Sequence, residues 1–230
     1  MVMRHPLSVR LTWAAAGAIL LLTPFALLAV LVVGNVGWLH ALDLRVTNAL
    51  HGFALHHPGW VDAMTWWSLI FHPNTWRVAV LVLVIWLARR NSWPLAWWAA
   101  VTMTAGGILG ALLKLLVGRH RPDLLDPVAR AAGFSFPSGH ALNNALGATI
   151  FLMVLLPLTT GRRGLRALLW SGAILIPLIT GLSRIGLGVH WTSDVVAGWL
   201  LGVAVPAATA TAFLAYGHRT ARLSTAGLDG

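Results

Sequence analysis

Three short polar clusters stand out in an otherwise apolar chain of 230 residues. Together they supply three cations, two histidines and one carboxylate, beside a serine and a glycine that can shape a helix terminus. Such a set can hold a phosphate group and transfer it to an imidazole, because phosphoryl transfer requires little beyond positioning and charge stabilisation. In chain order, the clusters are Lys114 with Arg121-Pro122, then Pro137-Ser138-Gly139-His140, then Ser183-Arg184 with His190 and Asp194.

The first cluster contains two cations that are seven residues apart. On a continuous helix, two turns would bring Lys114 and Arg121 onto one face. Pro122 disfavours helical geometry at the residue before it, so we expect the helix to end there. The alternative is a pair of basic side chains that extend from a membrane boundary into water, which is a common arrangement.

The second cluster has the sequence of a helix start. Ser138 is a plausible N-cap, which places Gly139 and His140 in the first turn. Free backbone N–H groups and the positive end of the helix attract an anion, and glycine allows that anion to approach closely. An ordinary capped helix with an interfacial histidine is the alternative.

The third cluster distinguishes the two histidines. His190 and Asp194 are four residues apart, so on a helix they share a face within hydrogen-bond reach. A carboxylate that accepts the proton of one ring nitrogen leaves the other nitrogen free as a nucleophile. We therefore predict that His190 attacks phosphorus and that His140 protonates the leaving oxygen. The alternative is a buried polar pair that holds helices together.

The clusters lie at the edges of membrane-length apolar segments. The chain is 58% hydrophobic and 10% charged, with a mean hydropathy of +0.78, whereas soluble domains carry about 25% charged residues. We therefore predict an all-α integral membrane protein, a six-helix bundle forming a single domain over residues 1–230. The predicted spans are residues 11–34, 76–88 with an upstream extension to 71, 95–117, 141–159, 168–187 and 191–216.

The stretch 35–74, between the first two spans, combines histidines with four tryptophans. Tryptophan is typical of the headgroup level, so we predict one or two helices lying on the outer leaflet. A seventh span is the alternative, but it would break the charge alternation described below. The histidines could bind a metal, but a solvated interfacial role is favoured and we assign them no function. They are His40, His51, His56, His57 and His72.

The arginines in short loops indicate the topology, because such loops are rich in basic residues on the cytoplasmic side. Alternation of the six spans places nine arginines on one side, together with both termini. We therefore predict an inner-membrane protein with cytoplasmic termini, an uncleaved first span and an active site that faces outward. The nine are Arg4, Arg10, Arg89, Arg90, Arg162, Arg163, Arg166, Arg219 and Arg222.

The composition also excludes several classes of site. The net charge of +10 could indicate nucleic acid, but the basic residues form no run or stripe of the kind that binds it. Without cysteine there is no disulfide or thiolate chemistry. Glutamate is absent too, and a chain with six aspartates offers little for a two-metal or paired-carboxylate mechanism. We expect no cofactor.

The three clusters together resemble the signature of the type 2 phosphatidic acid phosphatase family, which are membrane lipid phosphate phosphatases related to vanadium haloperoxidases. Residue types, order and spacing match at every signature position between residues 114 and 194. The resemblance implies phosphate binding by five of these residues, a phosphohistidine at His190 oriented by Asp194, and an acid–base role for His140. The five phosphate-binding residues would be Lys114, Arg121, Ser138, Gly139 and Arg184.

The sequence thus predicts metal-independent hydrolysis of a lipid phosphate or diphosphate, such as phosphatidate, phosphatidylglycerophosphate or polyprenyl diphosphate. The expected partners are this substrate and membrane lipids, with no nucleic acid; the sequence does not determine an oligomeric state. A transporter or channel for anions or lipids would explain the three cations but has no use for the paired histidine and aspartate. A haloperoxidase-like enzyme is the third reading, and its relatives are generally soluble.

Overall fold

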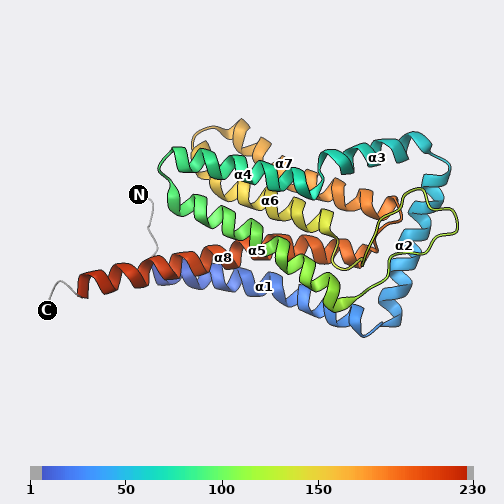
Figure 1. The fold of residues 1–230 in the computed structure, drawn as a ribbon, viewed down its shortest axis with the longest axis horizontal. Coiled ribbons are helices and arrows are strands. Elements are labelled where there is room, and N and C mark those ends of the chain that lie inside the picture. The colour runs from blue at the N-terminus through green and yellow to red at the C-terminus, as the bar shows by residue number, and fades with distance from the viewer. Residues whose placement is uncertain (1–6, 227–230) are drawn as a thin grey trace.

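The computed structural model describes residues 7–226, and within this range it contains helices and no strands. Arg4, one of the nine arginines of the predicted topology, and Asp229, one of the six aspartates, lie outside the described residues. In chain order the helices are α1 (Leu7–Val33), α2 (Gly37–Leu55), α3 (Pro58–Ile70), α4 (Pro73–Arg89), α5 (Trp93–Val117), α6 (Gly139–Leu155), the 3₁₀ helix η1 (Leu156–Thr159), α7 (Arg163–Gly186) and α8 (Thr192–Ala226) (Figure 1).

The protein is an all-α, multi-pass membrane protein. Five stretches of the described chain are long and apolar enough to cross a membrane: Pro58–Arg89, Trp93–Val117, Gly139–Thr159, Arg163–Gly186 and Thr192–Tyr216. Leu22–Val33 of α1 and the whole of α2 pass the same criterion together as a bent pair, so the structure has five such stretches, or six when this pair is counted as one span, and the sequence predicts six. Large apolar side chains such as Leu116 and Leu168 are exposed on the outer helices, as expected for a surface that faces lipid.

Local sequence explains most helix boundaries. Proline stands in the first turn of α3, α4 and α5, where the missing N–H costs nothing. The predicted spans agree with the helices to within a few residues, with two exceptions. α7 begins at Arg163, five residues before the predicted start, and α8 continues ten residues past the predicted end at 216.

α6 is the central helix of the bundle, since it packs against α4, α5, α7 and α8. Two glycines of α8 permit the closest of these approaches. A Cβ on Gly202 would lie 2.6 Å from the carbonyl oxygen of Leu142, and one on Gly198 would lie 2.8 Å from that of Ser138. Small residues four apart let the backbones of membrane helices approach in this way. The start of α6, which holds the second polar cluster, is therefore held firmly against α8.

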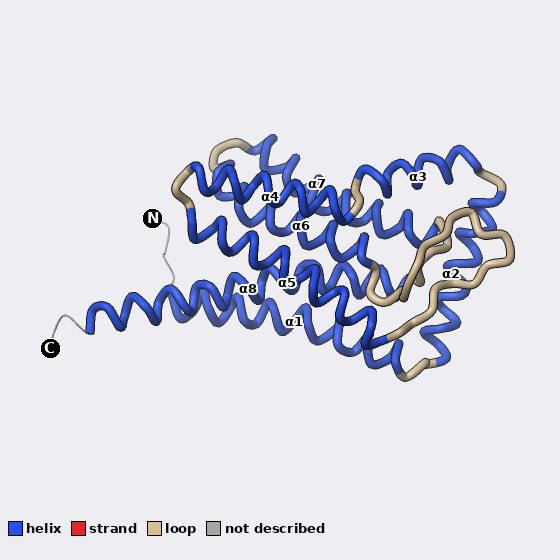
Figure 2. Tube along the Cα trace, viewed as in Figure 1, coloured by secondary structure: helices blue, strands red, loops and turns tan. Residues whose placement is uncertain are grey.

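The segment 35–74 forms two helices, α2 and α3, as the sequence predicts. α1 and α2 are bent by 93°, with Asn35 at a positive φ of 48° in the connecting turn. α2 consequently runs across one end of the bundle, next to the long loop between α5 and α6 (Figures 1 and 2). A position of these two helices on the membrane surface stays a prediction.

Candidate active site

The polar clusters meet at the end of the bundle that α2 covers. The backbone N–H of Ser138 donates to the carbonyl oxygen of Asp194 at 2.9 Å, which joins the second cluster to the third. A Cβ placed on Gly139 would lie 3.9 Å from Cε of Lys114, so the first cluster contacts the second. The first and third clusters also touch, because Nη1 of Arg121 lies 3.1 Å from Nε2 of His190. The structure thus brings three separate segments of sequence into one site.

The first cluster is arranged differently from the helical expectation. α5 ends at Val117, four residues before Arg121, because Gly118 adopts a left-handed conformation with φ 62° and caps the helix. Lys114 is therefore on the last turn of α5, whereas Arg121 is in the loop. The two cations reach the site from different directions instead of along one helix face.

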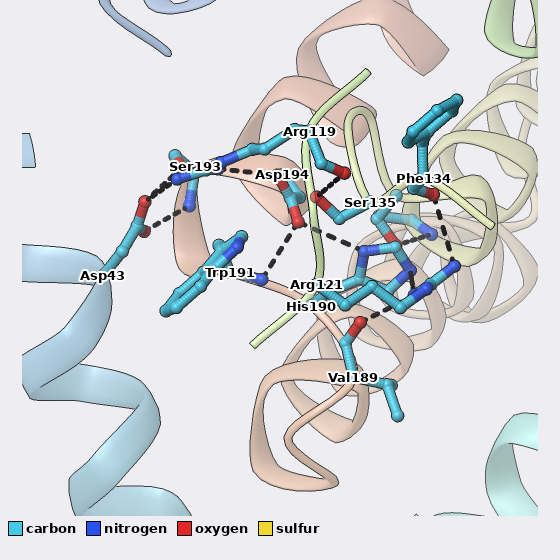
Figure 3. Close-up of polar contacts among 12 residues, drawn as sticks. Asp43, Arg119, Arg121, Phe134, Ser135, Val189, His190, Trp191, Ser193 and Asp194 are labelled. Atoms are coloured by element: carbon cyan, nitrogen blue, oxygen red, sulfur yellow. Dashed lines mark hydrogen bonds and ion pairs between the residues drawn. The ribbon is translucent and has the colours of Figure 1, made fainter. Parts of the chain in front are cut away.

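The third cluster forms a buried histidine–aspartate pair. His190 lies in the turn before α8, and its Nδ1 is 3.3 Å from Oδ2 of Asp194. A carboxylate only accepts, so Nδ1 carries the ring proton. The same oxygen accepts the backbone N–H of Trp191 at 3.0 Å, which fixes the carboxylate. Nε2 then carries the lone pair of the ring, and it accepts a hydrogen bond from Nη1 of Arg121 at 3.1 Å (Figure 3).

Burial keeps this imidazole neutral. His190 is only 2% exposed, and desolvation lowers its pKa to about 4, although the hydrogen bond and charge of Asp194 act in the opposite direction. At neutral pH the ring is therefore uncharged. A neutral imidazole with a proton on Nδ1 has the form that a nucleophile requires at Nε2.

Arg121 is held in place by the backbone of the surrounding loops. Besides its contact with His190, its guanidinium donates four hydrogen bonds to carbonyl oxygens. The acceptors are Gly133 (2.9 Å), Val189 (2.6 Å), Ala132 (3.1 Å) and Phe134 (3.3 Å). A guanidinium fixed in this way presents its charge at Nε2 with little freedom to move.

The other two cations approach the same place. Lys114 Nζ donates to the carbonyl oxygen of Phe134 at 2.9 Å and lies 3.4 Å from that of Ser135. Arg184, on the last turn of α7, has a buried Nε with no hydrogen-bond partner among residues 7–226. A buried donor of this kind is costly unless it is satisfied, so it points to a bound acceptor such as a phosphate oxygen.

The second cluster forms the expected helix start. Ser138 is the N-cap of α6, and its Oγ accepts the N–H of Ala141 at 3.5 Å. The first turn contains Gly139 and His140, whose backbone N–H groups precede the regular helix ladder. His140 also meets His72 edge to face, with ring centroids 5.2 Å apart. His72 was assigned no function from the sequence, and the structure places it beside the site.

A second group of residues, which the three sequence clusters do not include, binds the carboxylate of Asp194. Arg119 Nη1 donates to Oδ1 of Asp194 and Nη2 to Oδ2 of Asp43, both at 2.7 Å (Figure 3). Ser193 links the same residues: its backbone N–H and its hydroxyl donate to Asp43 at 2.9 and 2.6 Å, and its Oγ accepts from Arg119 at 2.7 Å. Both carboxylates are fully buried. Asp43 belongs to α2, so this network ties the crossing helix to the pair of His190 and Asp194.

Ser183, which belongs to the third cluster, makes contacts that join two helices. The hydroxyl of Ser183 is 2.9 Å from that of Ser68 and donates to the carbonyl of Thr180, so it joins α7 to α3. The histidines and aspartates within residues 7–226 form no group of three that could hold a metal ion.

Comparison with known proteins places the chain in a family. The model of the PAP2 superfamily matches residues 95–217, more than half of the chain and all three clusters. The protein therefore belongs to the PAP2 superfamily. The crystal structure of a transmembrane PAP2 type phosphatidylglycerolphosphate phosphatase from Bacillus subtilis has the same fold, with a TM-score of 0.72 over 84% of this chain and 93% of that one, at 24% identity.

The chain is also similar to curated family members. Phosphatidylglycerophosphatase B of Bacillus subtilis is 30% identical over 59% of this chain and 58% of its own length. The undecaprenyl-diphosphatase of Sulfolobus acidocaldarius is 36% identical over 41% and 44%. Decaprenylphosphoryl-5-phosphoribose phosphatase of Mycolicibacterium smegmatis is 32% identical over 67% and 71%. The match thus spans between 44% and 71% of these relatives' lengths.

Proposed function

We propose that the protein hydrolyses the phosphate of a membrane lipid phosphate through a phosphohistidine at His190, without a metal ion. The observation that carries this proposal is the buried pair of His190 and Asp194, whose geometry leaves Nε2 unprotonated and hydrogen-bonded to Arg121. A transporter needs the cations but not an imidazole whose tautomer is set by a carboxylate. The named relatives, which are phosphatases of lipid phosphates, support the same class of reaction.

The reaction takes place in two transfers. First, Nε2 of His190 attacks phosphorus, the bond from phosphorus to the lipid oxygen breaks, and His140 donates its proton to that oxygen. His140 then accepts a proton from water, whose oxygen attacks the phosphohistidine. This step breaks the phosphorus–nitrogen bond, releases inorganic phosphate and restores both histidines.

The surrounding groups stabilise the charge that moves through these steps. The cations Lys114, Arg121 and Arg184 would contact the phosphate oxygens, together with the hydroxyl group of Ser138 and the N–H of Gly139 at the start of α6. Asp194 would balance the positive charge that develops on His190 as Nε2 forms its bond to phosphorus.

An apolar groove between α4 and α5 provides a place for the lipid tail. It has a volume of about 520 Å³ and is lined mostly by aliphatic side chains of the two helices, including Val80, Leu81, Val84 and Ile108. Neighbouring side chains on the same helices are exposed to lipid, so a tail could enter from the side. The substrate would keep its tail in this groove while its phosphate reaches the site.

The direct test is phosphate release by the purified protein in detergent, with EDTA present throughout. We expect release from at least one of phosphatidate, phosphatidylglycerophosphate and undecaprenyl diphosphate. Activity that disappears in EDTA and returns with a divalent cation would overturn the metal-independent mechanism. A protein that is folded yet releases phosphate from none of the three lipids would overturn the proposed function.

We further propose that the site faces outward from the cytoplasmic membrane, with both termini inside. The described arginines of the loops at the opposite end of the bundle, such as Arg89 and Arg162, support this orientation. The chain has no cysteine, so labelling of a single introduced thiol is easy to interpret. The natural choice is Leu125→Cys, because Leu125 is fully exposed in the loop after α5. An impermeant maleimide should label it in intact cells, and labelling only after lysis would reverse the topology.

The lowered pKa of His190 predicts the pH dependence of the reaction. Protonation of Nε2 removes the nucleophile, so kcat/KM should fall about tenfold per pH unit as the pH drops below about 4, the pKa of the buried ring. An unperturbed histidine would produce this fall below about pH 6.5. A phosphate monoester also titrates, near pH 6, and this can add its own fall to the pH profile of kcat/KM. The fall that keeps the same pH when the substrate is changed belongs to the enzyme. An enzyme limb near pH 6.5 would contradict a buried, neutral His190.

A further inference from the structure

A small cavity connects the apolar groove to the candidate phosphate site. It has a volume of about 150 Å³ and shares Arg77, Gly107 and Ala111 with the larger groove. At its other end it is lined by Lys114 and Gly139, which belong to the phosphate site. A lipid with its tail in the groove and its phosphate at the site would therefore place the middle of its headgroup in this cavity.

Arg77 is the one charged residue among the described residues that line the apolar groove. Within the described chain its guanidinium makes a single hydrogen bond, from Nη1 to Oδ1 of Asn74 at 2.9 Å. Its Nη2 points across the groove and lies 3.9 Å from the position of a Cβ on Gly107. The remaining donors are thus available to a ligand, and a guanidinium fork suits an anionic phosphate.

Asn143 contributes an acceptor to the wall of the small cavity. It is 5% exposed, and its Nδ2 donates to the carbonyl oxygen of Gly139 at 2.8 Å, which fixes the orientation of the amide. Its Oδ1 is buried and has no hydrogen-bond partner within residues 7–226. A buried amide oxygen without a partner indicates that a donor, such as a hydroxyl group, binds there.

The spacing along α5 indicates what kind of headgroup fits. Gly107, opposite Arg77, and Lys114 are separated by seven residues, or about 10 Å along the helix axis. The phosphorus atoms of a diphosphate share one bridging oxygen, so a diphosphate covers only a small part of this distance. A glycerol unit between two phosphates covers more of this distance and carries a hydroxyl at its centre, where Asn143 offers its oxygen.

We propose that Arg77 and Asn143 form a second subsite that selects lipids whose headgroup holds two phosphates joined by a hydroxyl-bearing linker. Arg77 binds the lipid-proximal phosphodiester, and Asn143 accepts the linker hydroxyl. The terminal phosphate occupies the site at Lys114, so this inference rests on the proposed function. Phosphatidate, which has one phosphate, and polyprenyl diphosphate, which lacks the linker, use only part of the site.

The test compares kcat/KM for phosphatidylglycerophosphate and phosphatidate in mixed micelles of an uncharged detergent. The wild type should prefer phosphatidylglycerophosphate. Arg77→Gln should lower the ratio of the two values about 10- to 100-fold, the effect of removing a charge-assisted hydrogen bond from one substrate only. Asn143→Ala should lower the same ratio by a smaller factor, about threefold to tenfold, because it removes a neutral hydrogen bond.

Arg89→Gln is the matched control, because it removes the same charge from the opposite end of α4 and should leave the ratio unchanged. If Arg77→Gln lowers kcat/KM equally for both lipids, Arg77 positions the helix or contacts bulk lipid, and the second subsite is wrong. A ratio that does not change in either Arg77→Gln or Asn143→Ala also overturns it. A wild type inactive on both lipids and on undecaprenyl diphosphate instead refutes the proposed function.

Discussion

Replacing His190 with alanine is expected to lower the rate of phosphate release by about four orders of magnitude or more, because it removes the atom that we propose attacks phosphorus. The remaining cations can still bind and polarise the phosphate, so slow direct hydrolysis by water should account for the remaining rate of phosphate release. Release of inorganic phosphate from a lipid substrate in detergent measures the effect. The variant should stay folded, since His190 is neutral and the alanine removes no charge.

His56→Ala is a suitable control for this variant. His56 is an exposed histidine directly after α2, and the one hydrogen bond of its side chain within residues 7–226 is to the carbonyl oxygen of Gly52. It should keep wild-type activity and the same melting temperature. Equal rates for wild type and His190→Ala would show that another group attacks phosphorus, and the mechanism proposed here would be wrong even if the lipid phosphatase activity itself is present.

Much of the fold was predictable because a membrane protein encodes its helices in long apolar runs. Proline and serine mark most helix starts, and the N-cap at Ser138 was predicted from four residues of sequence. The end of α5 was harder to predict. Pro122 indicated a stop, but Gly118 ended the helix sooner through its left-handed conformation, and either residue was a plausible signal.

The network of Asp43 and Arg119 that binds Asp194 could not be predicted in the same way. Asp43 and Arg119 are 76 residues apart, and they meet only because α1 and α2 bend by 93°. Neither spacing nor periodicity specifies that bend. One signal was available, since Asp43 is one of six acids in a strongly apolar chain and a buried carboxylate requires a partner. The small number of acidic residues marked Asp43 as unusual, but only the fold shows that its partner is Arg119.

Replacing Arg119 with glutamine is expected to cost about 3–5 kcal/mol of stability, because it leaves Asp43 and Asp194 buried without their shared cation. A lowered melting temperature in detergent measures this loss. Asp43→Asn removes one of the two buried negative charges that the loss of Arg119 leaves unpaired. The double variant Arg119→Gln/Asp43→Asn should therefore recover part of the stability, with a coupling of about 0.5–3 kcal/mol. Additive losses would show that the two residues do not interact.

Arg119→Lys separates a role in positioning from a role in folding. Lysine keeps the positive charge, so the melting temperature should recover most of the loss seen with glutamine. A single ammonium lacks the planar fork that reaches Asp43 and Asp194 at once, so the carboxylate that orients His190 becomes less fixed. We therefore expect kcat to fall about tenfold with little change in KM, because a misoriented imidazole affects attack more than lipid binding. If Arg119→Lys restores both stability and kcat, Arg119 supplies charge alone, and the network holds the fold without orienting the nucleophile.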